Sequence, residues 1–298
     1  MKLKNANENL KLKMLLPVMY AVTVLLIIMR TFQLTRYIDS ETGFITGGNA
    51  LYVIFLAVIA IAVVGFTVVS YLSAEGRKIE LIGLKDKACS IASVLFGVSL
   101  IYDSFTSFKD SVLILNNMYF DAYINKAELF KLLMSTGALP YAVQSIFAVI
   151  SAVYIFILAK SFSSGSRKAH DRKYIALAPI VWVAFKIITR FVKQISYIKV
   201  SDLFLELIML ALMILFFVAF AQVVSGVYSD DSRWRITALG FGSALVSLSI
   251  NIPRLVLTVF AGDFVNKEYP FNLADTAFAV FAICVVITVI KKCENKAE

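Results

Sequence analysis

The chain has 298 residues, of which 60% are hydrophobic and only 16% are charged, and its mean hydropathy is +0.82. Soluble domains carry roughly a quarter charged residues, so this composition excludes an ordinary soluble domain and indicates a membrane protein. The net charge of +9 is spread over several short segments instead of being clustered on one helix, so we expect no nucleic-acid partner.

Eight apolar runs follow one another, each near the roughly 20 residues that cross the hydrocarbon core of a membrane. The short alternating segments of a β-barrel are absent from the sequence. The predicted fold is therefore all-α, a polytopic integral membrane protein with about eight transmembrane helices in one domain, 1–298. The first run is too long for a cleaved signal peptide and is expected to stay as the first span. The runs cover approximately 14–35, 51–72, 88–108, 138–161, 174–198, 201–226, 235–261 and 271–290.

Residues 27–38 and 187–198 are similar without a gap, and the alignment places Arg30 opposite Arg190. Each segment ends the first span of a group of four, an arrangement that two parallel four-helix halves would produce. Isoleucine matches are common in membrane helices, however, and the other three pairs of spans align poorly, so a bundle without a repeat stays the alternative. The two halves would be 1–165 and 166–298.

The longest connection, about 109–137, mixes apolar and polar residues. It predicts an interfacial helix or an outward extension of the fourth span, because it is too polar for a ninth crossing. The other connections are too short to hold a soluble domain.

Lysine and arginine are distributed unevenly between the two sides of the predicted bundle. If the N-terminus is cytoplasmic, 18 of these residues fall in inner segments and six in outer loops. This bias predicts that both termini are cytoplasmic and that the protein lies in the plasma membrane, in contact with anionic lipids.

Charges inside the predicted spans are the main clue to function, because an ionisable residue in hydrocarbon is costly. Lys186, Arg190 and Lys193 lie on one stripe of the fifth span. The sixth span runs antiparallel beside it, so Glu206 is expected at the level of Arg190 to Lys193. Asn251 and Arg254 flank Pro253 in the seventh span. The candidate ligand-binding residues are Arg30, Asp103, Lys186, Arg190, Lys193, Glu206, Asn251, Arg254 and Asp275.

Two interpretations of these charges stay open. In the first, they are buried pairs that fix helix packing, such as Arg190 with Glu206, or Arg254 with Asp275 and Asp103. In the second, they line a water-filled cavity open to the outside, on which Arg30, Arg190 and Arg254 converge. Counting Asp202, the spans hold five cations and four carboxylates, which makes an anionic ligand plausible.

Enzyme motifs are missing from the sequence, so we expect no enzyme, no catalytic residue, no metal and no cofactor. The best hypothesis is a transporter or permease-type protein with an outward-facing charged cavity for a small solute, anionic solutes included. The alternative is a non-enzymatic accessory, assembly or sensing protein whose charges are structural. The partners considered are membrane lipids, a small-molecule or ion ligand, and a cytoplasmic or membrane subunit.

Overall fold

A computed structural model describes eight stretches of the chain, and the following account is confined to them. They are residues 2–37, 49–74, 85–118, 125–166, 172–192, 200–226, 231–260 and 271–294.

The described residues are almost entirely helical and contain no β-strand, which confirms the predicted all-α fold. Eight helices are long and apolar enough to cross a membrane, and each coincides with one predicted span. Two shorter elements, α4 and the 3-10 turn η1, lie between them. The elements are α1 (Lys2–Arg36), α2 (Asn49–Ala74), α3 (Lys87–Asn116), α4 (Lys126–Ser135), α5 (Ala138–Ser164), η1 (Ile175–Leu177), α7 (Ala178–Val192), α8 (Val200–Val224), α9 (Ser232–Phe260) and α10 (Leu273–Glu294).

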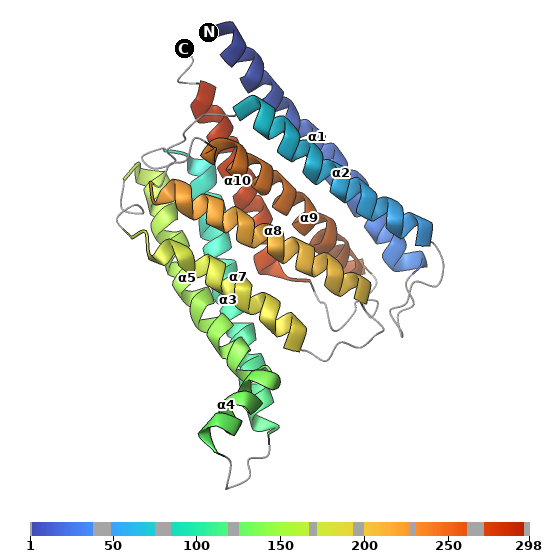
Figure 1. Ribbon diagram of the computed structural model, residues 1–298, viewed down its shortest axis with the longest axis vertical. Coiled ribbons are helices and arrows are strands. Elements are labelled where there is room, and N and C mark those ends of the chain that lie inside the picture. Colours follow the sequence, from blue (N-terminus) through green and yellow to red (C-terminus); the bar gives the residue numbers. More distant parts are fainter. Residues whose placement is uncertain are drawn as a thin grey trace.

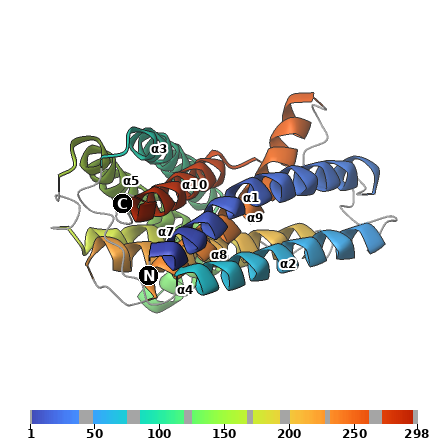
Figure 2. The same cartoon turned by 90° about the horizontal axis from the view of Figure 1, so that it is seen from above.

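Helix α9 lies at the centre of the bundle and contacts α1, α2, α8 and α10. On the other side, α3 packs against α5 and α10, and α5 packs against α7. Figure 1 shows α1 and α2 along one flank, α3 and α5 along the other, and both chain ends at the same end of the bundle; Figure 2 shows the same order from above. The division into halves 1–165 and 166–298 stays a prediction.

Aromatic rings fill the interior where α3, α8 and α10 meet. The Phe96 ring stacks on Phe281 with centroids 5.4 Å apart, and Phe217 lies 5.2 Å from Phe278. Such tight packing fixes the helices relative to one another, and it brings Trp182 of α7 within 6.2 Å of Phe96. Trp182 is the side chain that connects this core to the charged region described below.

The connection at 109–137 contains a separate short helix, so of the two predicted alternatives the extension of the fourth span is wrong and a separate helix remains. Helix α3 continues to Asn116, whereas α5 begins only at Ala138, after Gly137 with φ of 88°. A residue in this left-handed conformation ends a helix, so α4 is a separate short helix with no buried residue. The helical extension therefore belongs to the third span and not to the fourth.

Candidate functional site

Glu206 of α8 joins two arginines from the helices on either side. Its Oε2 lies 2.9 Å from Arg190 Nε on α7, and its Oε1 accepts a hydrogen bond from Arg254 on α9. All three side chains are largely buried. The predicted neighbourhood of Glu206 and Arg190 is confirmed. The predicted pairing of Arg254 with Asp275 and Asp103 is wrong, because α8 packs directly on α9 and presents Glu206 to it.

One turn earlier on α8, Asp202 accepts a hydrogen bond from Arg30 of α1. The other guanidinium nitrogen of Arg30 donates to Gln33 Oε1 at 2.9 Å, and Arg30 is only 2% exposed. The Phe55 ring of α2 covers the guanidinium, with its centroid 5.7 Å away. Arg30 thus links α1 to α8, and its guanidinium group is surrounded by Asp202, Gln33 and Phe55.

Lys186 of α7 lies between two carboxylates from different helices. Its Nζ is 2.5 Å from Asp275 Oδ1 on α10 and 3.9 Å from Asp103 Oδ1 on α3. Asp103 also accepts hydrogen bonds from Trp182 Nε1 at 2.9 Å and from Gln144 Nε2 at 3.2 Å. These buried groups form a network that links α3, α5, α7 and α10.

Asn251 of α9 helps to position the start of α10. Its side-chain oxygen accepts the backbone N–H of Asn272 at 3.3 Å, which holds the chain just before α10. The Asn272 side chain in turn accepts the N–H groups of Ala274 and Asp275 and so caps α10. Asn251 therefore helps to set where Asp275 meets Lys186.

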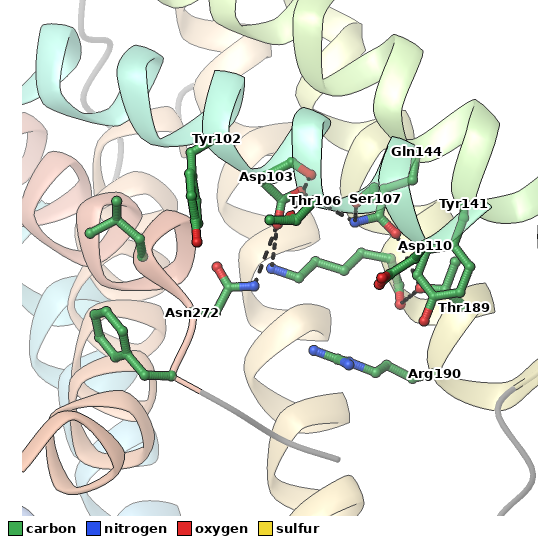
Figure 3. Close-up of a pocket in the computed structure, with 13 residues that line it drawn as sticks. Tyr102, Asp103, Thr106, Ser107, Asp110, Tyr141, Gln144, Thr189, Arg190 and Asn272 are labelled. Atoms are coloured by element: carbon green, nitrogen blue, oxygen red, sulfur yellow. Dashed lines mark hydrogen bonds and ion pairs between the residues drawn. The ribbon is translucent and has the colours of Figure 1, made fainter. Parts of the chain in front are cut away.

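A cavity of about 400 Å³ opens beside the Lys186 network, in the half of the bundle opposite the chain ends. Helices α3, α5, α7 and the start of α10 supply its walls, and all lining side chains except Phe271 and Leu273 carry a polar group. We call it the polar cavity (Figure 3). It is lined by Tyr102, Asp103, Thr106, Ser107, Asp110, Tyr141, Gln144, Lys186, Thr189, Arg190, Phe271, Asn272 and Leu273.

The predicted candidates divide into two groups around this cavity. Asp103, Lys186 and Arg190 line it. The polar cavity is not shared by the three arginines, since Arg30 and Arg254 are not among its lining residues. Lys193 lies outside the described residues. Glu206, Asn251 and Asp275 do not line the cavity, but each contacts a residue that does. Arg30 and Arg254 lie one contact further away, since their carboxylate partners Asp202 and Glu206 are not lining residues.

Several lining residues were absent from the sequence-based candidates. Thr106, Ser107 and Asp110 follow the predicted Asp103 at helical spacing along α3, so a polar stripe in an otherwise apolar span was the signal that could have found them. Tyr141 and Gln144 form a second, shorter stripe at the start of α5. Asn272 lies just before α10, and no stripe of polar residues around it in the sequence marks it as a cavity residue.

Within the described residues, the charges that the sequence placed inside the spans balance. The four cations Arg30, Lys186, Arg190 and Arg254 each contact a carboxylate, and their partners are the four carboxylates Asp103, Asp202, Glu206 and Asp275. The excess of one cation counted from the sequence came from Lys193, whose side chain is not described. Within the same residues no group of three or more metal-ligating side chains is found.

Comparisons with protein-family models, with curated proteins and with solved structures found no match to this chain. The functional argument therefore rests on the geometry of the polar cavity and of the ion pairs around it.

Proposed function

We propose that the chain is a membrane protein of the transporter or permease type that binds a small polar solute in the polar cavity. The observation that carries the proposal is a cavity lined by hydroxyl, amide and charged groups within a bundle that is otherwise packed with apolar side chains. A volume of about 400 Å³ suits a small molecule, since ligand pockets span roughly 300–1,000 Å³.

The ion pairs support this function by holding the cavity walls in place. Lys186 links α7 to α10, and Glu206 links α7 to α8 and α9. Polar residues that face a cavity in a membrane bundle are tolerated because water or a solute satisfies them. A preformed polar cavity also lowers the cost of ordering side chains when a solute binds.

The proposal includes an orientation. We infer from the bias of lysine and arginine that both termini are cytoplasmic, with the protein in the plasma membrane. The polar cavity lies in the half of the bundle opposite the chain ends and then faces the outside. A solute would enter it from the extracellular or periplasmic side.

A thermal-shift screen of the purified protein against small polar solutes tests the proposal. A solute at about 100 times its Kd should stabilise the fold by about 2.7 kcal/mol and raise the melting temperature. Thr106→Trp fills the polar cavity and should abolish that rise. Its matched control is Phe105→Trp, because Phe105 is 67% exposed and points away from the protein interior. A rise that survives Thr106→Trp would place the solute elsewhere.

One observation favours an accessory, assembly or sensing protein as the second candidate. Arg30, Lys186, Arg190 and Arg254 each already contact a carboxylate, which is the pattern expected of ion pairs that only fix helix packing. Under that function no solute in the screen raises the melting temperature, and neutral substitutions at Arg190 change basal stability alone. Under the proposed function the same substitutions also change the stabilisation by the solute.

A further inference from the structure

We propose, on the basis of the solute-binding function above, that the polar cavity recognises a solute bearing an ammonium group and that Asp110 is its counter-ion. Free amines and zwitterions such as amino acids share this chemistry. The inference replaces the anionic solute that the charge count of the sequence made plausible.

The charges that line the cavity differ in how far they are already neutralised. Lys186 contacts Asp275, and Arg190 contacts Glu206, so both lining cations are held by carboxylates outside the cavity. Asp103 accepts hydrogen bonds from Trp182 and from Gln144. Glu206 is shared by Arg190 and Arg254, whereas Lys186 lies near two carboxylates, Asp275 and Asp103. Counted together, the three cations face three carboxylates, so they offer an incoming anion no net positive charge.

Asp110 is the exception. It lines the cavity, it is half-buried, and no described residue makes a hydrogen bond or an ion pair with it. The three cations Lys186, Arg190 and Arg254 and the three carboxylates Asp103, Asp275 and Glu206 balance one another, so Asp110 leaves the cavity wall and its ion-pair partners together with one net negative charge. A cation bound beside it gains an ion pair that is partly shielded from water, where such pairs are stronger than at an exposed surface.

The surroundings of Asp110 fit an ammonium group. Figure 3 shows Tyr141 and Thr189 at the same end of the cavity as Asp110, with Arg190 along the adjoining wall. An ammonium group donates up to three hydrogen bonds and is attracted to aromatic faces, so the carboxylate, the hydroxyls and the Tyr141 ring are suitable partners. Tyr102 and Asn272 lie at the far end, where they would contact the rest of the solute.

Equilibrium binding to the purified protein tests this inference with four series of compounds that share their carbon skeletons: monoamines, amino acids, monocarboxylates and polyols. We expect binding in the amine or the amino-acid series, and whichever of the two binds more tightly identifies the source of the ammonium group. Asp110→Asn should weaken that binding about tenfold or more, which corresponds to about 1.4 kcal/mol per tenfold change. Asp110→Glu should restore part of it.

The control for charge is Asp231→Asn, which removes a carboxylate that pairs with Arg235 outside the cavity and should leave the affinity unchanged. An unchanged melting temperature of Asp110→Asn shows that the variant folds. Binding restricted to carboxylates or polyols, or binding of amines that is unaffected by Asp110→Asn, would overturn the inference while the solute-binding function stands. If no series binds the wild-type protein, the proposed function itself fails.

Discussion

Glu206→Gln is expected to lower the free energy of unfolding by about 3–5 kcal/mol, the usual cost of breaking a buried ion pair. Glu206 is 2% exposed and is the carboxylate shared by Arg190 and Arg254. Glutamine keeps the shape but removes the negative charge, so two neighbouring guanidinium groups repel each other in a region of low dielectric. Unfolding by denaturant in mixed micelles measures the loss.

The matched control for Glu206→Gln is Asp231→Asn, which also replaces a carboxylate with an amide. Asp231 and Arg235 are about 40% exposed, and such pairs contribute no more than about 1 kcal/mol. The test compares the loss of unfolding free energy in Glu206→Gln with the loss in Asp231→Asn. Equal losses at Glu206 and Asp231 would mean that the Glu206 cluster is solvated and does not hold α7, α8 and α9 together.

Lys186→Met should cost a similar amount, about 3–5 kcal/mol, because it leaves the carboxylate of Asp275 buried without its cation and withdraws a positive charge from Asp103. Methionine matches the length of the lysine stem, so the variant removes the charge with little change in packing. The measurement is again the free energy of unfolding.

The double variant Lys186→Met with Asp275→Asn should recover most of that loss. Replacing both members of a buried pair with neutral groups is often nearly neutral, so the two substitutions should be strongly non-additive. Asp103 should remain in place because Trp182 and Gln144 still donate hydrogen bonds to its carboxylate. Losses that simply add would show that Lys186 and Asp275 do not interact in the folded protein.

Paired charges explain how a bundle of this kind keeps a polar cavity open. The Lys186–Asp275 contact spans α7 and α10, which share few other close approaches, and Arg190 with Glu206 fixes α7 against α8. Without these pairs the apolar helices could slide to close the cavity. Under the proposed function, the charges act mainly by positioning the walls of the cavity.

The spans were predictable from sequence because lipid requires long apolar helices, and all eight coincide with helices of the structure. The proximity of Glu206 to Arg190 was predictable for a local reason, since a short connection makes neighbouring helices antiparallel. By contrast, the partners of Arg254 and Lys186 depend on which helices pack side by side. Apolar spans of similar composition carry little information about that order, so the pairs with Glu206 and Asp275 required the structure.

The sequence predicted a polar cavity but only three of the residues that line it, Asp103, Lys186 and Arg190. A polar cavity near Arg190 was expected from the clustered charges, yet much of its wall consists of hydroxyl and amide groups, most of them on α3 and α5. Serine, threonine and glutamine are common in membrane helices and attract less notice than charges. The spacing of Asp103, Thr106 and Asp110 along α3 was the available signal.

The most direct test of the central claim is whether water reaches the polar cavity from outside the cell. Ser107→Cys places a thiol in the cavity wall, and Ser93→Cys places one on the same helix in the packed interior, about 21 Å away along α3. Both are made after Cys89, Cys284 and Cys293 have been replaced with alanine. A membrane-impermeant thiol reagent added to intact cells should label Ser107→Cys and not Ser93→Cys. Labelling of Ser107→Cys only after the membrane is opened, or no labelling at all, would contradict an outward-facing solute cavity.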